Sequence, residues 1–436
     1  MRQDLARALA NAFLAGQWDQ PGLVDSGALV IRRRARWLPV LSRQVLALYP
    51  HPPADRPREL AAVIATRPAA GRTGTARPLN RPVSPTRMVT NPWHLPVLND
   101  LSDLAVLLNL SAPELAWFSD PRHWARSAAT AALQHYRVST RPASSGAVRV
   151  LEAPKPRLKA LQRRLLHEVL VGLPAHDAAH GFLPGRSVAT YGRPHANQAV
   201  VVRLDLEGFF ASVGVGRIYG TLRTAGYPEP VAHCLAGLVT TVLPLRTWQA
   251  VPRPPDPSLL DAHWRLGRRL AAPHLPQGAP TSPALANLAA HRLDVRLTAL
   301  ARSWGGRYTR YADDLAFSGG RNWRAGTSRL LDLIAEITRD EGFRLNDRKT
   351  AVLPRAGRQV LGGLVVNDRP HVGRADVDLL KAVLHNCIQH GPSTQNLQGK
   401  PDFHAHLTGR VNWVSQHDPA RGARLREQLD AIDWTR

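Results

Sequence analysis

Residues 310–319, RYADDLAFSG, place two carboxylates, Asp313 and Asp314, inside an otherwise apolar and aromatic stretch. Residues 202–206, VRLDL, carry a third carboxylate, Asp205, in an apolar run. Burying charge among apolar strands is costly unless a cation or another partner compensates it. Asp is also common in ordinary β-turns, which would account for Asp313 and Asp314 alone. The aromatic flanks and the distant Asp205 instead favour a hairpin turn that presents carboxylates to hard cations.

Three such carboxylates suit Mg²⁺, which takes one or two carboxylates, keeps water ligands and shares its other positions with substrate phosphates. Two ions ~3.5–4 Å apart can together activate an attacking hydroxyl and stabilise a leaving pyrophosphate. In a basic protein, Asp205, Asp313 and Asp314 therefore predict nucleotidyl transfer with two Mg²⁺ ions, for which Mn²⁺ can substitute.

The charge of the chain points to a polyanionic partner. Its 436 residues carry 57 Lys and Arg against 33 Asp and Glu, a formal net charge of +24. A protein this basic most often meets nucleic acid or an anionic membrane. The longest apolar stretch, residues 234–245, is shorter than the ~20 residues of a spanning helix, and the N-terminus lacks the order of a signal peptide. We therefore expect a cytoplasmic protein with no membrane partner.

Two N-terminal segments differ in composition. Residues 1–66 have the apolar spacing of short helices and include a basic triplet, Arg32-Arg33-Arg34. Residues 67–92 interleave arginine with proline and contain no acidic residue. We predict a helical extension followed by a basic linker, which is either a spacer or a nucleic-acid contact.

Hairpin and helix patterns alternate through the rest of the chain. Residues 136–138 and 148–151 predict a β-hairpin with a turn at 144–146. No regular strand-helix rhythm of a doubly wound sheet is present, so the pattern favours an α+β fold.

Several longer stretches resemble the motifs of bacterial reverse transcriptases, and they occur in the family order. The three catalytic motifs correspond to LDLEGFFASV at 204–213, PQGAPTSPALANL at 276–288 and RYADDLAFSG at 310–319. Supporting matches are AHGFLPGRS at 179–187, GFRLNDRKT at 342–350 and VLGGLVVN at 360–367. Within this family the chain is most similar to retron reverse transcriptases.

The resemblance implies an α+β right-hand polymerase that makes DNA on an RNA template from dNTPs. Its fingers would occupy residues 93–200, its palm, with an antiparallel sheet, residues 201–366, and its helical thumb residues 367–436. The helical extension at 1–66 and the linker at 67–92 would precede them.

The resemblance also assigns catalytic roles. Asp205, Asp313 and Asp314 would be catalytic metal ligands, and the carbonyl of Leu206 would complete one coordination sphere. Lys349 matches the lysine that protonates the leaving pyrophosphate, with a solvated surface lysine as the alternative.

Four residues match dNTP-binding positions of the family. Arg149 matches the fingers arginine that grips the triphosphate, where a planar guanidinium suits phosphate oxygens. Gln277 and Gly278 match the segment that lies over the incoming base pair. Phe210 matches the aromatic residue that blocks a ribose 2′-hydroxyl, with a core phenylalanine as the alternative.

Five residues are predicted to bind nucleic acid: Arg186, His195, Arg410, Arg421 and Arg424. His195 matches the histidine of a retron signature after the GRS element, with a packing histidine as the alternative. The three thumb arginines would contact a duplex backbone, or else form a solvated helix face.

A retron-type enzyme would use a cognate structured noncoding RNA as template and primer. Its product would be a branched RNA–DNA molecule, msDNA, used in anti-phage defence with an effector protein as a further partner. The alternatives are another bacterial reverse transcriptase, of the group II intron, diversity-generating or abortive-infection type, or a catalytically silent RNA-binding scaffold. Intact Asp205, Asp313 and Asp314 argue against a scaffold, because clustered carboxylates repel RNA.

Overall fold

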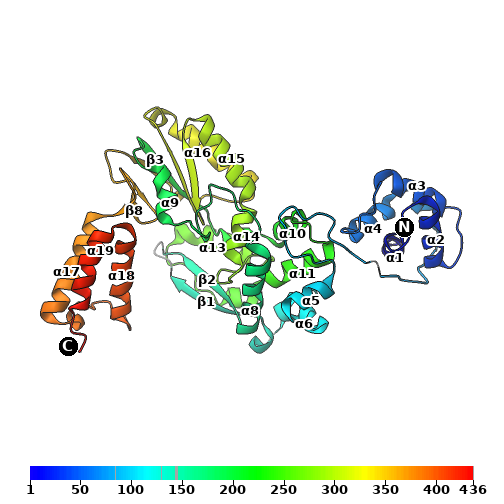
Figure 1. Cartoon of the computed structure of the whole chain (residues 1–436), viewed down its shortest axis with the longest axis horizontal. Helices are drawn as coiled ribbons and strands as arrows, with labels where there is room; N and C mark the ends of the chain where they lie inside the picture. The colour runs from blue at the N-terminus through cyan, green and yellow to red at the C-terminus, as the bar shows by residue number, and fades with distance from the viewer. Residues whose placement is uncertain (84, 129, 143–145, 436) are drawn as a thin grey trace. The chain divides into compact units, whose positions relative to one another are not determined.

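The computed structural model describes residues 1–83, 85–128, 130–142 and 146–435 (Figure 1). The chain divides into two compact units, each assembled from separate stretches of sequence. Unit 1 contains Met1–Pro174 and Phe210–Ala289, and unit 2 contains Ala175–Phe209 and Ala290–Arg436. The predicted metal ligands belong to unit 2, whereas the predicted dNTP-binding residues belong to unit 1.

Unit 1 begins with a bundle of helices, drawn in blue in Figure 1: α1 (Gln3–Ala15), α2 (Gln20–Ile31), α3 (Leu38–Leu48) and α4 (Pro57–Thr66). Their apolar faces enclose a core in which Leu9, Phe13 and Leu41 are fully buried. This confirms the predicted helical extension. The core extends past residue 66, because Ala69 and Ala76 also belong to it, so the first part of the predicted linker packs on the bundle.

The rest of unit 1 combines helices with one hairpin. Its first part contains α5 (Leu101–Leu108), α6 (Ala112–Ser119), α7 (Trp124–Ser127), η2 (Ala131–Leu133), β1 (Tyr136–Pro142), β2 (Val148–Pro154), α8 (Pro156–Leu165) and η3 (Leu166–Leu170). Its second part contains η5 (Phe210–Ser212), α10 (Val215–Thr224), α11 (Glu229–Val239), α12 (Leu245–Gln249), η6 (Pro257–Leu259), α13 (Leu260–Leu270) and α14 (Ser282–Ala289). Antiparallel β1 and β2 confirm the predicted hairpin, while residues 143–145 of its turn lie outside the described residues.

A four-stranded antiparallel sheet forms the centre of unit 2. The strands β3 (Val200–Asp205), β4 (Arg307–Tyr311), β5 (Asp314–Gly319) and β6 (Ala351–Pro354) are ordered β4-β5-β3-β6. They are accompanied by α9 (Val188–Gly192), η4 (Arg193–His195), α15 (His291–Ser303), α16 (Trp323–Asp340) and η7 (Asp347–Lys349). The sheet confirms the antiparallel sheet expected of the palm.

Unit 2 ends in a small sheet and a helical bundle. The elements are β7 (Val360–Leu361), β8 (Leu364–Val365), β9 (His371–Val372), α17 (Arg374–His390), η8 (Pro392–Thr394), α18 (Phe403–His417) and α19 (Pro419–Asp430). The last three helices, orange to red in Figure 1, share a core with Leu384, Leu407 and Val411 fully or almost fully buried. Helices α17, α18 and α19 confirm the helical character predicted for the C-terminal segment.

Helices and antiparallel strands thus form the α+β fold that the sequence predicts. Among the described residues, no helix combines the length and the apolar character needed to cross a membrane.

Candidate active site

The register of the central sheet brings the predicted carboxylates together. Strands β3 and β5 are antiparallel, and Asp205 lies directly opposite Asp314. Strands β4 and β5 pair up to Tyr311 and Asp314, which leaves Ala312 and Asp313 as a two-residue turn. The Leu206 backbone N–H donates to the Asp313 carbonyl at 2.9 Å. All three carboxylates and Leu206 therefore lie at one end of the sheet.

The turn that carries Asp313 has a strained backbone. Ala312 has a φ of 55°, a left-handed conformation that costs a residue with a Cβ roughly 1–2 kcal/mol. A Cβ added to Gly181 would lie only 2.8 Å from the Ala312 nitrogen, so glycine at 181 leaves room for the turn. Such strain persists only where the surroundings hold it, and it is frequent at functional sites.

A buried ion pair supports the same turn. The Arg310 guanidinium is fully buried and donates to both carboxylate oxygens of Asp294, at 2.8 and 2.6 Å. It also donates to the Ala312 carbonyl at 3.1 Å, and the Tyr308 hydroxyl donates to Asp294 at 2.8 Å. Burial opposes the charged form, yet Asp294 raises the pKa of Arg310. Arg310 therefore stays charged, and its hydrogen bond to the Ala312 carbonyl holds the turn.

Two further side chains surround the Asp205 carboxylate, which is only 5% exposed. The Lys349 Nζ lies 2.7 Å from Oδ2 of Asp205. The Asn346 side-chain amide donates to Oδ1 at 3.2 Å, and its backbone N–H donates to the Asp205 carbonyl at 2.8 Å. Lys349 thus contacts the carboxylate cluster, although its side chain is 46% exposed. Sequence analysis did not single out Asn346, although it lies in the GFRLNDRKT stretch.

The electrostatics of the cluster fit a divalent cation. Burial, followed by the charges of Asp313 and Asp205, raises the pKa of Asp314 from 3.8 to about 6. Lys349 and Arg203 offset only part of this. Crowded, partly desolvated carboxylate oxygens are the ligands that a hard cation such as Mg²⁺ prefers. As the side chains are placed, no group of three or more His, Cys, Asp or Glu residues among those described forms a ready metal site.

In unit 1, strand β2 joins three of the four predicted dNTP-binding residues. Arg149 is an exposed residue of β2. Farther along the strand, the Glu152 backbone N–H donates to the Gln277 carbonyl at 2.8 Å. Gly278 has a φ of 131°, and a Cβ there would lie 3.1 Å from the Glu152 carbonyl, so a glycine lets this segment pack closely on β2. Phe210, half-buried, begins η5 elsewhere in the unit.

The β1–β2 hairpin has a basic face that the sequence analysis missed. Arg141 lies directly opposite Arg149 in the register, and both side chains are exposed. Like charges directly opposite each other destabilise a strand pair, whereas a polyanion bound between them would remove the repulsion. Residues 139–142 are all exposed, so the pattern of β1 gives no local signal that could have identified Arg141.

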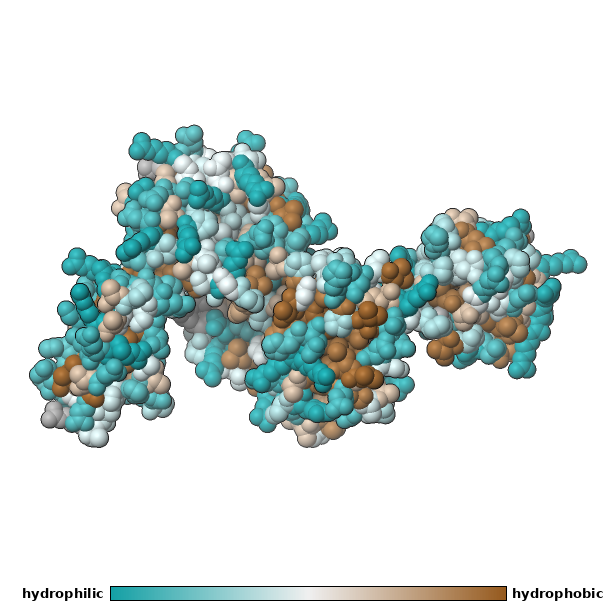
Figure 2. All heavy atoms as spheres, viewed as in Figure 1, coloured by the Kyte–Doolittle hydropathy of each residue, from teal (hydrophilic) through white to brown (hydrophobic). Residues whose placement is uncertain are grey.

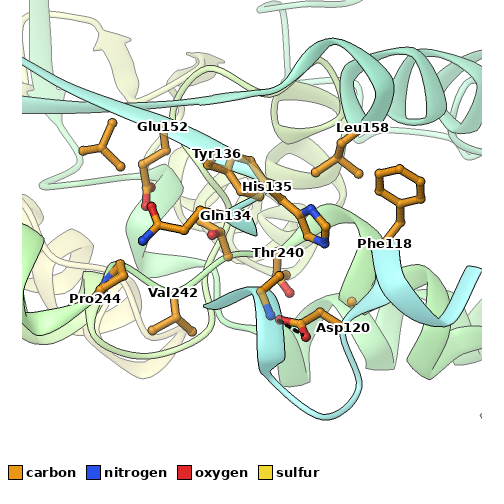
Figure 3. A pocket seen from close by; sticks show the side chains of 14 residues that line it. Phe118, Asp120, Gln134, His135, Tyr136, Glu152, Leu158, Thr240, Val242 and Pro244 are labelled. Carbon is orange, nitrogen blue, oxygen red and sulfur yellow. Dashed lines mark hydrogen bonds between the residues drawn. The ribbon is translucent and has the colours of Figure 1, made fainter. Parts of the chain in front are cut away.

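A small pocket lies behind this hairpin (Figure 3). Its lining includes Glu152, Gln134 and Tyr136, and its volume is about 30 Å³. The Glu152 carboxylate pairs with the buried ring of His274 at 2.8 Å. A space of this size suits a water molecule and is far too small for a nucleotide, so the exposed face of β2 is the better candidate for nucleotide binding.

A comparison with known families identifies the chain. The family described as "Reverse transcriptase (RNA-dependent DNA polymerase)" matches residues 140–364, just over half of the chain. This range contains β3, β4 and β5 with all three carboxylates, as well as β2 with Arg149. The chain belongs to the reverse transcriptase family. It is an RNA-directed DNA polymerase, and the N-terminal bundle lies outside the matched range.

The curated relatives of this reverse transcriptase include retron enzymes. Retron Mx65 reverse transcriptase of Myxococcus xanthus is 38% identical over 333 residues, which cover 76% of this chain and 72% of that protein. Retron Mx162 reverse transcriptase of the same organism is 38% identical, covering 78% and 68%. Retron Ec86 reverse transcriptase of Escherichia coli is 29% identical, covering 78% and 91%. Among solved structures, a foamy viral protease-reverse transcriptase is 14% identical, with a TM-score of 0.33, and covers 69% of this chain and 44% of that one.

The residues of the reverse transcriptase predicted to contact nucleic acid lie in several places. Arg186 is exposed in the loop before α9. Arg410 lines a groove of about 720 Å³ beside α18, together with Arg358, His406 and Trp413. Arg421 and Arg424 are exposed on α19, outside the lining of that groove, and Arg421 pairs with Asp418. Of these three arginines, Arg410 alone lines the groove.

An exposed aromatic ring that sequence analysis missed lies beside the catalytic turn. Phe182 has a φ of 61° and is 53% exposed, and its ring centroid is 6.3 Å from that of Tyr311. Tyr311 in turn packs against the buried Tyr191 at 5.9 Å. Exposed aromatic rings are able to stack on nucleobases, and Phe182 packs beside Tyr311, the last residue of β4 before the turn that carries Asp313.

The prediction that His195 binds nucleic acid is wrong, because its side chain is fully buried. Its Nδ1 and Nε2 lie 2.7 Å from the Ser318 and Thr309 hydroxyls, respectively. The Thr309 hydroxyl donates to the Tyr191 carbonyl, so it accepts from Nε2, and Nδ1 accepts from Ser318. The neutral ring joins η4 to strands β4 and β5, so the packing alternative holds.

We expect His195 to make the stability of the enzyme depend on pH. Burial, with smaller contributions from His180 and Arg307, lowers the pKa of His195 from 6.5 to about 3. Between these values the unfolded chain binds a proton that the folded chain does not, so stability is lost as pH falls below 6.5. At about pH 5 the loss from this group should be roughly 2 kcal/mol.

Chemical denaturation of the wild type and of His195→Gln, each at neutral pH and near pH 5, would measure this effect. The variant should lose less stability on acidification than the wild type does, whatever its stability at neutral pH. Equal losses in the two proteins would contradict the assignment of a neutral buried ring.

Proposed function

We propose that this reverse transcriptase is a retron-type enzyme that copies a cognate structured noncoding RNA into DNA. It would use dNTPs and two Mg²⁺ ions, which Mn²⁺ can replace, and yield branched RNA–DNA, msDNA, for anti-phage defence. The observation that carries the chemistry is the register that places Asp205 opposite Asp314 beside the Asp313 turn. The retron subtype is supported by relatives that are themselves retron reverse transcriptases.

In this proposal Asp205, Asp313, Asp314 and the Leu206 carbonyl hold the metal ions. Bound ions would lower the pKa of the attacking hydroxyl and neutralise charge on the phosphates. The strained turn at Ala312 and the Arg310 pair beneath it keep the carboxylates oriented before substrate arrives. Lys349, which is 2.7 Å from Asp205, would give a proton to the leaving pyrophosphate.

Nucleotide binding would use the face of unit 1 built on β2. Arg149 and Arg141 offer two guanidinium groups from opposed strands, and planar guanidinium groups bind phosphate oxygens in a bidentate manner. Gln277 and Gly278 form a segment held to the same strand by the Glu152 backbone, where the absence of a Cβ permits close approach to a base pair. Phe210 would press against C2′ of the sugar.

The change Phe210→Ala is expected to reduce the preference for dNTPs over rNTPs. A ring against C2′ leaves no room for a 2′-oxygen, and such overpacking costs about 1–3 kcal/mol, which corresponds to about 5- to 150-fold in selectivity. The measurement is the ratio of kcat/KM for dCTP and CTP in primer extension. Phe210→Tyr keeps the bulk of the ring and should retain the selectivity. If the ratio of kcat/KM for dCTP and CTP were unchanged in Phe210→Ala, Phe210 would be a core residue and not the residue that excludes the 2′-hydroxyl.

The partners follow from the same proposal. The noncoding RNA and its DNA product would contact Arg186 and the thumb arginines Arg410, Arg421 and Arg424, and an effector protein would complete the defence system. The enzyme would act in the cytoplasm, away from membranes.

The proposed function is tested by purifying the protein from its native host and sequencing the bound nucleic acid, with and without RNase treatment. A single short DNA joined to one structured RNA is expected. Bound RNA with no attached DNA would overturn the retron subtype in favour of another bacterial reverse transcriptase. A protein that also fails to extend a primer on an added RNA template would be a silent scaffold.

A further inference from the structure

The basic triplet between α2 and α3 forms a surface that the proposed polymerase chemistry does not use. Arg32, Arg33 and Arg34 are all exposed and line an open hollow of about 630 Å³ together with Leu29 and Asn80. We call these five residues the arginine surface. Arg34 pairs with Asp25, which also lines the hollow, at 2.7 Å. Within the part of the chain that the structure describes, Arg32 and Arg33 form no ion pair, so two positive charges remain uncompensated.

The backbone at Arg32 is unusual for an arginine. Arg32 ends α2 in the left-handed conformation, with φ 51° and ψ 32°, a position that glycine or asparagine normally fills. An arginine there is strained by roughly 1–2 kcal/mol. The attraction of its charge to the negative end of the helix, about 0.3–1 kcal/mol, offsets only part of this strain, and no acidic partner among the described residues adds to that attraction. Strain at an exposed, unpaired cation is more readily explained by binding than by folding.

The predicted linker adds to this surface. The backbone N–H groups of Leu79 and Asn80 both donate to the Val30 carbonyl, at 2.8 and 3.0 Å, which places this part of the linker against the end of α2. Arg81 follows directly and is exposed. No acidic residue lies anywhere between Glu59 and Asp100. The linker therefore supplies further positive charge beside the triplet and no acidic residue to oppose it.

Apolar side chains accompany these cations. Leu29 is 68% exposed and Leu79 is 63% exposed. On the face shown in Figure 2 the N-terminal bundle carries apolar groups among hydrophilic ones. A surface of guanidinium groups interleaved with apolar groups suits a flexible polyanion, whose phosphates pair with arginine while its sugars and bases cover the apolar atoms.

We propose that the arginine surface binds the phosphate backbone of single-stranded RNA, at a site separate from the polymerase centre. Arg32 and Arg33 each contact a phosphate, and Arg81 extends the path along the linker. The N-terminal bundle is then an RNA-binding module, and the basic linker is a nucleic-acid contact and not a passive spacer. The inference stands independently of the retron subtype.

The test compares full-length wild type with Arg32→Gly/Arg33→Gln, using poly(U) RNA as the probe across a range of salt concentrations. Each phosphate contact contributes about 0.7 to the slope of log K against log salt for single strands, so the slope should fall by about 1.4 in the variant. Glycine suits the left-handed position, so the thermal midpoint of the variant should be unchanged or higher. Extension of a short primer–template should be unchanged.

The matched control is Arg7→Gln/Arg43→Gln, which removes the same charge from exposed positions of the same bundle. Its salt slope should equal that of the wild type. Equal losses in both double variants would show a general effect of net charge and overturn the proposal, as would a wild-type slope in Arg32→Gly/Arg33→Gln. If Arg32→Gly/Arg33→Gln lost primer extension but kept the wild-type salt slope, the bundle would have no RNA site there. The loss of extension would then contradict the polymerase assignment.

Discussion

Replacing Asp205 with asparagine is expected to lower the rate of DNA synthesis by at least about 10³-fold, which corresponds to about 4 kcal/mol of the stabilisation that a metal centre supplies to the transition state. The side chain keeps its shape, but it loses the charge that faces Asp314 across β3 and β5. RNA binding should be retained, because the thumb and the N-terminal bundle are untouched. Primer extension under single-turnover conditions, alongside RNA affinity, measures the two effects separately.

Glu207→Gln provides the matched control for Asp205→Asn. Glu207 lies two residues farther along, carries the same charge and pairs loosely with Arg344 at 3.9 Å. Its neutralisation should leave synthesis near the wild-type rate. Two outcomes would refute the assignment of Asp205 as a metal ligand. In the first, Asp205→Asn keeps a tenth or more of the wild-type rate. In the second, Glu207→Gln loses as much activity as Asp205→Asn does.

Truncating Asp294 to alanine is expected to destabilise the enzyme by about 3–5 kcal/mol, because Arg310 would be left as an uncompensated buried charge. Both side chains of this pair are completely inaccessible to solvent. The double change Arg310→Met/Asp294→Leu should recover most of that stability, since well-packed apolar residues often replace a buried ion pair at little cost. This stable double variant should nevertheless synthesise DNA more slowly than the wild type. The Ala312 carbonyl loses the hydrogen bond from Arg310, so the turn that carries Asp313 is no longer held.

Equilibrium unfolding and primer extension on the same preparations separate folding from positioning. An exposed pair in the same unit, Arg296 and Asp340 at 2.9 Å, is the control, and Asp340→Ala should cost no more than about 1 kcal/mol. A double variant that is both stable and fully active would show that the Arg310 pair has no part in holding the turn.

Much of the candidate site could be predicted from local patterns. A carboxylate in an apolar run indicates a strand end that carries charge, and this predicted both Asp205 and the Asp313 turn. The sequence signals for the hairpin at 136–151 and for the helices of residues 1–66 are also local, because side-chain periodicity depends only on the nearest few residues. The roles of Arg149, Phe210, Gln277 and Gly278 came from the resemblance and remain proposals.

Other features depend on contacts between residues far apart in the chain. Arg141 is recognised as a candidate phosphate-binding residue only from the register, which places it opposite Arg149. Asn346 joins the site because the backbone after α16 returns to Asp205. His195 follows a recognisable motif, yet it packs against two hydroxyl groups more than a hundred residues away. No local pattern distinguishes a buried histidine of this kind from one that contacts RNA.

The sequence by itself determined the family, the α+β class and the three carboxylates, because each is expressed in short stretches whose spacing and polarity are set locally. Tertiary structure alone decided two further pairings of charge: Lys349 with Asp205, and Arg310 with Asp294. The physical reason is that the energy of a charge depends on burial and on its neighbours. Both arise only when distant strands pair and exclude water.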